Sequence, residues 1–142
     1  MKAKILIGLP ASGKTTWIKE NRQDELVINC DSIRMMLQNT PNKYEAFVAQ
    51  DESIVWNTFC DLIGNIWKSR KDIIIDNPNC NKKLLDQLLI RLHGLGYKEE
   101  FIVIDTQLQE IKERLKDYPH MQVVVENMNR GFLEVKNWVE RG

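Results

Sequence analysis

The feature that most constrains this chain is the stretch GLPASGKTTW at residues 8–17, which follows the apolar run KILI. Gly8, Gly13, Lys14 and Thr15 satisfy the pattern G-x-x-x-x-G-K-[ST] of a phosphate-binding loop. A random chain of this length would contain the pattern about one time in two hundred. The segment AKILIGL predicts a short buried strand and TTWIKENR predicts a helix, which is the context that such a loop requires.

The residue types of this stretch have a physical reason. Glycines let backbone N–H groups converge on phosphate oxygens, and the start of a helix adds a partial positive charge. We therefore expect the loop to bind ATP or another nucleoside triphosphate through Gly8, Leu9, Pro10, Ala11, Ser12, Gly13, Lys14, Thr15 and Thr16. Lys14 should reach the β- and γ-phosphates, and the Thr15 hydroxyl should bind Mg²⁺. Trp17 is predicted to pack in the core on the inner face of the helix.

Length and composition restrict the class of protein. The 142 residues predict a single domain over 1–142. Lys+Arg and Asp+Glu both number 20, and this zero net charge disfavours a protein that coats duplex nucleic acid, although an enzyme that grips only a strand end is compatible. Cys30, Cys60 and Cys80 lack metal or redox spacing and suit buried thiols in a reducing cytoplasm. With no run of membrane length and no signal-peptide pattern, we expect a cytoplasmic location.

Apolar segments alternate with helical patterns along the chain. Further strands are predicted at 25–29, 72–76 and 99–105. Helices are predicted from Asp31, over 44–70, over 81–93, from a Thr106/Gln109 capping box to Pro119, and around 125–139. This alternation predicts an α/β fold with a parallel sheet of about four strands and helices on both faces. Ligands of such sheets bind at the carboxyl ends of the strands, so the residues after each strand are the candidates for the site.

The segment NCDSIR follows the second predicted strand. Asp31 and Arg34 lie three residues apart at the start of a helix, so both can face the crevice beside the phosphate loop. Asp31 could accept a proton from an attacking hydroxyl as a general base, and Arg34 could hold an acceptor phosphate through a bidentate contact. The alternative is that Asp31 is only an N-cap and Arg34 a solvated surface residue.

The segment DNPNCN follows the third predicted strand. Asp76 ends an apolar run, which is a position where a carboxylate helps to hold hydrated Mg²⁺. Asn77 and Asn79 could donate hydrogen bonds to phosphate or substrate, and Asn77 is the candidate that we assign to substrate binding. Their alternative is an ordinary turn or cap role.

Arginines follow the fourth predicted strand. Arg114 lies in the helix TQLQEIKERLKDY, and Arg130 lies in the segment after Pro119. Short helical lids bring arginines over a transferring phosphate, where they offset developing charge, and we assign this catalytic role to Arg114. The alternative for Arg114 is a surface pair with Glu110. His120 is interpreted as a loop residue.

With these segments in order, the chain resembles the bacteriophage polynucleotide 5′-kinase family within the zeta-toxin-like P-loop kinases. The resemblance is carried by GLPASGKTTW, NCDSIR, IIIDNPNCN and EIKERL, which cover nearly all of 1–142. It implies a P-loop kinase fold with a short helical lid, Asp31 as general base on a 5′-hydroxyl, and Arg34 on the acceptor's 3′-phosphate. Lys14 and Thr15 would serve ATP and Mg²⁺, and Asp76 would lie near acceptor and metal.

The chain departs from that family in two ways. Tyr118 stands where relatives often carry a second lid arginine, and Arg130 is the candidate substitute. No D-x-D-G-T phosphatase motif occurs, so phosphatase activity is not expected.

The leading hypothesis is therefore an ATP- and Mg²⁺-dependent kinase that phosphorylates a 5′-hydroxyl of DNA or RNA. The first alternative is a kinase of a nucleoside, nucleotide or sugar, and the second is a nucleotide-dependent switch or binding module. The absence of an N-K-x-D motif and the presence of Asp31 with Arg34 disfavour the switch.

Overall fold

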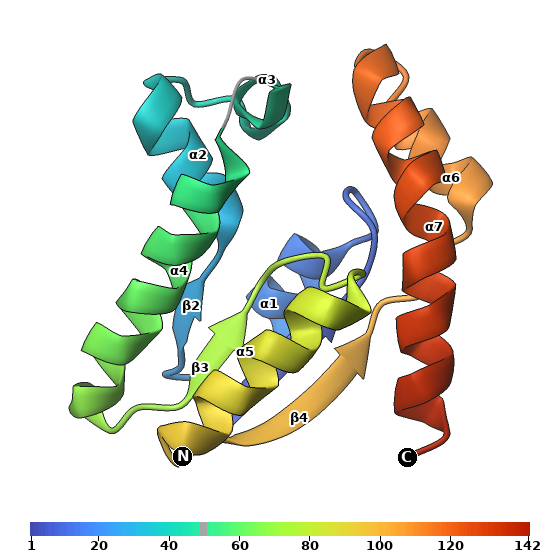
Figure 1. The fold of residues 1–142 in the computed structure, drawn as a ribbon. Helices are drawn as coiled ribbons and strands as arrows, with labels where there is room; N and C mark the ends of the chain where they lie inside the picture. Colours follow the sequence, from blue (N-terminus) through green and yellow to red (C-terminus); the bar gives the residue numbers. More distant parts are fainter. Residues whose placement is uncertain (49–50) are drawn as a thin grey trace.

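The computed structural model describes residues 1–48 and 51–142, in which strands and helices alternate (Figure 1). The strands are β1 (Lys2–Ile7), β2 (Leu26–Ile28), β3 (Ile73–Ile75) and β4 (Lys98–Val103). The helices are α1 (Lys14–Asn21), α2 (Cys30–Gln38), α3 (Lys43–Val48), α4 (Glu52–Ile66), α5 (Lys82–Gly94), α6 (Leu108–Arg114) and α7 (Pro119–Glu140), with a 3₁₀ turn η1 (Trp67–Ser69). None of these helices is long and apolar enough to cross a membrane.

The described strands form one parallel sheet with the order β2-β3-β1-β4. On β1, Ile5 pairs with Ile75 of β3 on one side and with Phe101 of β4 on the other. Because all pairs are parallel, the carboxyl ends of the strands meet at one edge of the sheet, and the loops after β1, β2 and β3 open there. The predicted α/β fold with a four-stranded parallel sheet is confirmed.

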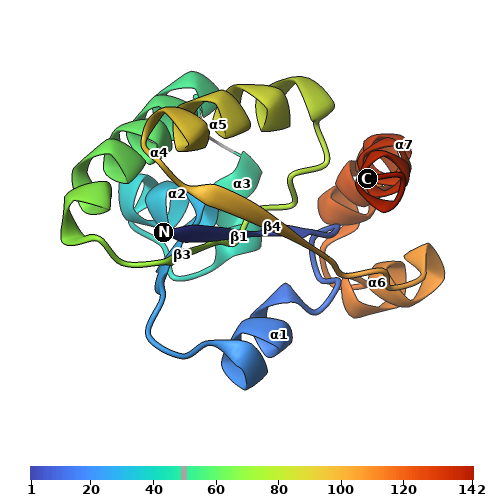
Figure 2. The same ribbon diagram turned by 90° about the horizontal axis from the view of Figure 1, so that it is seen from below.

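Helices cover both faces of the sheet, as predicted. Figure 2 shows α2, α4 and α5 on one face and α1 on the other, with α6 and α7 beside the β4 edge. The prediction that Trp17 packs in the core is wrong. Trp17 is only half-buried, and none of the eight residues of α1 is fully buried. A single short helix does not enclose side chains on this face of the sheet.

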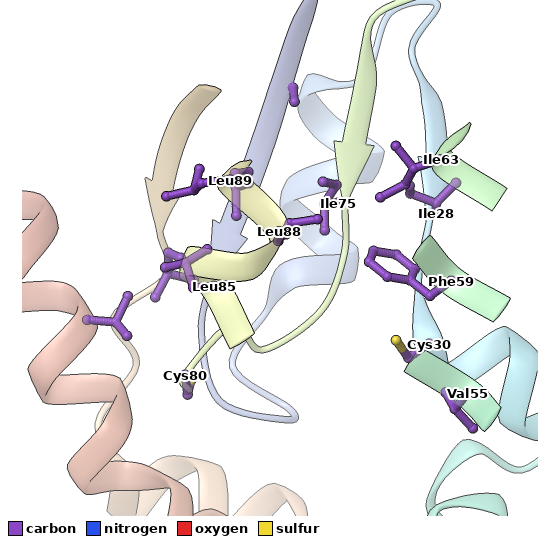
Figure 3. Close-up of a cluster of buried hydrophobic side chains, with 14 of the residues drawn as sticks. Ile28, Cys30, Val55, Phe59, Ile63, Ile75, Cys80, Leu85, Leu88 and Leu89 are labelled. Atoms are coloured by element: carbon purple, nitrogen blue, oxygen red, sulfur yellow. The ribbon is translucent and has the colours of Figure 1, made fainter. Parts of the chain in front are cut away.

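The core lies between the sheet and helices α4 and α5 (Figure 3). Phe59 of α4 is fully buried with Ile28 and Ile75, and Leu85 and Leu88 of α5 belong to the same cluster. Each fully buried side chain of this size is worth roughly 1.5–3 kcal/mol. This packing fixes the strand ends from which the candidate site residues project.

The predicted helix over 44–70 is wrong as a single element, and residues 49–50 lie outside the described ones. A new helix begins after Asp51, whose side chain accepts a hydrogen bond from Ser53 N at 3.0 Å. A short α3 precedes it, capped by Asn42, whose Oδ1 accepts from Tyr44 N at 2.9 Å. Asn42 and Asp51 each cap the start of a separate helix, which divides the predicted segment.

The capping box predicted at Thr106 and Gln109 is also wrong. Gln107 is the N-cap of α6 without a side-chain hydrogen bond, whereas Thr106 Oγ1 donates to Ser12 O at 2.6 Å. Thr106 therefore ties the chain after β4 to the phosphate loop. Pro119 does not stop α6, which ends at Arg114. Instead, Pro119 starts α7, where a missing N–H costs nothing.

The three cysteines are free and buried, as expected. Burial raises the pKa of Cys30 to about 11 and that of Cys80 to about 12, so these thiols stay protonated at neutral pH.

Candidate active site

The phosphate loop between β1 and α1 has the backbone that its sequence predicts. Gly13 has a φ of 111°, and Ala11 has a φ of 63°, so the chain turns sharply before α1. A Cβ on Gly8 would lie 2.6 Å from Ser12 Oγ, and Gly8 N donates to Pro78 O at 3.0 Å. The absence of a side chain on the first glycine thus permits its close contact with Ser12 and with Ile104, the residue after β4.

Lys14 reaches back over the loop. Its Nζ donates to Gly8 O at 2.7 Å and to Leu9 O at 3.0 Å, and burial lowers its pKa to about 8. Within the described residues, Ser12 Oγ is the buried side-chain polar atom that has no hydrogen-bond partner. A buried ammonium and an unpaired hydroxyl beside the start of a helix fit a bound polyphosphate.

The loop opens into a cavity of about 700 Å³, a size suited to small ligands. The segments that follow β1, β2 and β3 meet at this cavity, together with residues of α5 and α7. Its wall includes Pro10, Ala11, Gly13, Lys14, Thr15, Asp31, Arg34, Lys43, Tyr44, Phe47, Glu52, Trp56, Asp76, Asn77, Asn79, Lys82, Lys83, Met121, Met128 and Gly131. The other predicted loop residues do not line the cavity. Gly8, Leu9 and Ser12 are buried, and Thr16 is exposed on α1.

Asp31 is not the N-cap of α2. That role belongs to Asn29, whose Oδ1 accepts from Ser32 N at 2.6 Å. Asp31 lies in the first turn with its side chain 39% exposed, and it accepts a hydrogen bond from Arg34 Nη1 at 2.9 Å. Its carboxylate is therefore available to the cavity that it lines.

Arg34 is buried rather than solvated. Its side chain is 11% exposed, and its guanidinium carbon lies 4.9 Å from the centre of the Phe47 ring. Besides Asp31, it binds Glu52, the first residue of α4, through two hydrogen bonds. The sequence reasoning missed Glu52, although Asp51 with Ser53 two residues later signals a helix start at this point.

Asp76 and Asn77 lie at the end of β3 and line the cavity. Burial raises the pKa of Asp76, opposed by the nearby Lys14 ammonium. Asn77 is buried, and its Oδ1 accepts from Cys30 N at 2.8 Å, which fixes the start of α2 and so the position of Asp31.

Thr15 and Asp76, the predicted Mg²⁺ ligands, both line the cavity. Mg²⁺ is commonly held by one or two carboxylates together with substrate phosphates and water. In the described parts of the chain, no cluster of three or more acidic, histidine or cysteine residues could hold a metal by itself. A hydroxyl and a single carboxylate beside a phosphate loop match a Mg²⁺ site that is completed by substrate phosphates and water.

Arg114 reaches the phosphate loop from the end of α6. Its Nη1 donates to Ala11 O at 2.8 Å, and its Nη2 donates to Glu110 Oε1 at 2.8 Å. The surface pair with Glu110 exists, yet the same guanidinium also contacts the loop. Arg130 is exposed on α7 and does not line the cavity.

Tyr118, the residue before α7, connects α7 to α3, and residues of both helices line the cavity. Its ring centroid lies 4.9 Å from that of Tyr44, and its hydroxyl accepts from Asn42 Nδ2 at 2.9 Å. His120 contributes a contact of 3.0 Å between Nε2 and Tyr44 O. We call these four residues the α3–α7 bridge. The interpretation of His120 as a loop residue is wrong, because it lies in the first turn of α7 and takes part in this bridge.

Lys43, at the start of α3, is another residue that the sequence reasoning missed. It lines the cavity, its charge acts on both Lys14 and Asp76, and its Nζ lies 5.2 Å from the centre of the Tyr44 ring. The segment NKYE, with a cap residue followed three positions later by Glu, could have located this helix start.

Comparison with known families assigns this architecture. The family model described as "AAA domain" matches residues 4–130. The chain belongs to this AAA domain family. The matched range contains the phosphate loop, the Asp31–Arg34 pair and α6. No curated protein matches the sequence.

Solved structures show the same fold at low sequence identity. A chain from the Pnkp1/Rnl/Hen1 RNA repair complex is 19% identical with a TM-score of 0.75, over 96% of this chain and 45% of that one. The Mycobacterium tuberculosis APS kinase CysC, in complex with AMPPNP and APS, is 16% identical with a TM-score of 0.57, over 80% and 68%. A gluconokinase from Sinorhizobium meliloti 1021 is 16% identical with a TM-score of 0.56, over 89% and 74%.

These neighbours confirm the P-loop kinase fold. A further chain of a Pnkp1/Rnl/Hen1 complex is 21% identical with a TM-score of 0.65, over 80% of this chain and 38% of that one. This chain spans less than half the length of the two repair-complex chains.

Proposed function

We propose that this protein is a Mg²⁺-dependent kinase that transfers the γ-phosphate of ATP to a 5′-hydroxyl of DNA or RNA. The observation that carries the proposal is the position of Asp31. Its carboxylate lines the same cavity as Lys14 and is not used as a helix cap, because Asn29 takes that role. A switch or binding module has no need of a carboxylate that shares a cavity with the phosphate loop.

The transfer assigns one task to each residue. Asp31 orients the acceptor hydroxyl and takes its proton as the new O–Pγ bond forms and the bond from Pγ to the β-bridging oxygen breaks, which releases ADP. Lys14 binds the β- and γ-phosphates, and Arg114 offsets charge on the transferring group. Thr15 and Asp76 would hold Mg²⁺, which neutralises phosphate charge. Arg34 anchors an acceptor phosphate, and Asn77 positions α2 beside the acceptor.

The walls of the cavity support a nucleic-acid acceptor. Tyr44, Phe47 and Trp56 offer aromatic rings, and Lys43, Lys82 and Lys83 add positive charge around the same space. Aromatic rings that stack on bases and cations that meet phosphates are the usual means of binding single strands. A zero net charge agrees with binding one strand end rather than a long duplex.

A small-molecule kinase is the second candidate. Two observations favour it, namely the cavity of about 700 Å³ and the likeness in fold to a gluconokinase and an APS kinase. Incubation with labelled ATP, Mg²⁺ and a panel of 5′-hydroxyl oligonucleotides, nucleosides and small alcohols separates the candidates. We expect label on oligonucleotides, whereas transfer to small acceptors alone would support the second candidate.

The Asp31→Asn variant tests the role of the carboxylate directly. It keeps the shape of the side chain but cannot take the proton, so transfer should fall by roughly a hundred- to ten-thousandfold. ATP affinity and the melting temperature should hardly change, because Asn29 caps α2 and the loop is intact. The matched control is Asp61→Asn on the exposed face of α4, which should transfer at the wild-type rate. Near-normal transfer by Asp31→Asn would refute the proposed base.

A further inference from the structure

The hydrogen bonds of Arg34 define two edges of its guanidinium group. Nη1 donates to Asp31 Oδ1 at 2.9 Å. Along the other edge, Nε donates to Glu52 Oε2 at 3.0 Å and Nη2 donates to Glu52 Oε1 at 2.5 Å. This second contact is a two-pronged pairing of a guanidinium edge with two oxygens of one anion, which is also how arginine binds a phosphate.

The two partners differ in how firmly they are held. The Arg34 side chain is 11% exposed and packs over the Phe47 ring, whereas the Glu52 side chain is 55% exposed. Water can solvate the half-exposed Glu52 carboxylate when it leaves, and an anion that takes its place keeps the buried guanidinium edge paired. Exchange of Glu52 for another anion therefore costs less than loss of Glu52 alone.

Glu52 also lines the same cavity as Asp31. An anion that replaced Glu52 on the Nε/Nη2 edge would stand beside the carboxylate that Arg34 holds through Nη1.

We propose that Glu52 determines acceptor affinity by occupying the edge of Arg34 that a phosphate of the acceptor, adjacent to its reacting nucleoside, would bind. The inference rests on the proposed function, since it assigns that site to a phosphate-bearing acceptor. Binding of such an acceptor must displace Glu52. An acceptor without this phosphate leaves the Arg34–Glu52 pair intact.

Equilibrium binding tests this competition without requiring transfer. Adenosine 3′-phosphate and adenosine are titrated by calorimetry into the protein saturated with ADP and Mg²⁺, which fill the phosphate loop. Glu52→Gln keeps the side-chain size but weakens the pair, so it should tighten adenosine 3′-phosphate by roughly three- to tenfold and leave adenosine unchanged. Adding Arg34→Gln to Glu52→Gln should abolish the gain.

Two further variants serve as a charge control and as a substitute if Glu52→Gln does not fold. Glu45→Gln removes the same charge from an exposed position on α3 and should change neither affinity. If Glu52→Gln does not give a cooperative thermal melt, Glu52→Asp keeps the charge at the start of α4 but withdraws the carboxylate, and it should show the same selective gain.

Several results would overturn the inference. These are an unchanged or weakened affinity for adenosine 3′-phosphate in Glu52→Gln, an equal gain for adenosine, an equal gain in Glu45→Gln, or no binding of adenosine 3′-phosphate by either protein. The transfer assay on the same preparations reports separately on the proposed function. A wild-type protein that transfers to no acceptor refutes the kinase proposal and leaves the binding comparison standing.

Discussion

Gly131 lies inside α7, where the helix meets the segment after β3. A Cβ built on Gly131 would lie 2.2 Å from Cys80 O, far inside van der Waals contact. That carbonyl belongs to backbone, so it cannot simply rotate away as a long side chain would. Gly131→Ala must therefore push α7 and the Cys80 segment apart by about 1 Å, because an ordinary contact between these atom types needs more than 3 Å.

The size of the effect follows from two opposing terms. Alanine in a helix interior normally stabilises by up to about 1 kcal/mol relative to glycine. Overpacking of a rigid contact costs about 1–3 kcal/mol. Because backbone must move, the cost lies near the upper end of this range, and the alanine gain offsets about a third of it. We therefore expect Gly131→Ala to lower the free energy of unfolding by about 2 kcal/mol, which lowers the melting temperature by several degrees.

Gly64 offers a matched control within α4. It is also helical, and a Cβ there would meet nothing within 4 Å, so Gly64→Ala should stabilise the protein by up to about 1 kcal/mol. Urea and thermal unfolding of wild type and both variants measure the contrast, which is a difference in sign. A Gly131→Ala variant as stable as Gly64→Ala would refute the tight contact between α7 and Cys80.

Three further predictions concern the site and the sheet. Lys14→Ala and Thr15→Ala should both abolish transfer, yet a Mg²⁺ titration should partly rescue only Thr15→Ala, since that variant loses a metal ligand rather than a phosphate contact; equal rescue would contradict these separate roles. Arg114→Ala should lower turnover by about a thousandfold or more with little change in ATP affinity, and steady-state kinetics showing less than a tenfold drop would leave it as the surface pair with Glu110. A hydrogen bond from Lys4 lowers the pKa of Glu25 from 4.5 to about 2, so the stability that this carboxylate contributes is present above pH 4.5 and is lost as the pH falls toward 2. The gap in unfolding free energy between wild type and Glu25→Gln, measured in urea, should accordingly shrink from pH 6 to pH 2, and a constant gap would contradict the pairing.

The parts of the fold that could be predicted from sequence are those fixed by local chemistry. Short apolar runs located the strands, and the glycine pattern located the phosphate loop with Lys14 and Thr15. The carboxyl ends of the strands then indicated Asp31 and Asp76 as site residues, and both line the same cavity. Each step needed only the residues within a few positions, plus the rule that parallel strands end together.

The parts that could not be predicted depend on contacts between distant residues or on a choice between equal local signals. Glu52 meets Arg34 across 18 positions, and Thr106 meets Ser12 across 94. At α2 the competition was local, because Asn29 and Asp31 are equally good caps and only the path of the chain decides between them.

The α3–α7 bridge is a weak link between two helices that both line the cavity. Three contacts cross it: the Asn42–Tyr118 hydrogen bond, the His120–Tyr44 O contact and the Tyr44–Tyr118 ring pair. Contacts of these kinds contribute about 0.5–1.5 kcal/mol each, so breaking all three costs about 1.5–4.5 kcal/mol. At equilibrium the form without them would make up between roughly one molecule in thirteen and one in two thousand. Separation of α3 from α7 is then within reach of thermal motion, before any binding energy of a substrate is available.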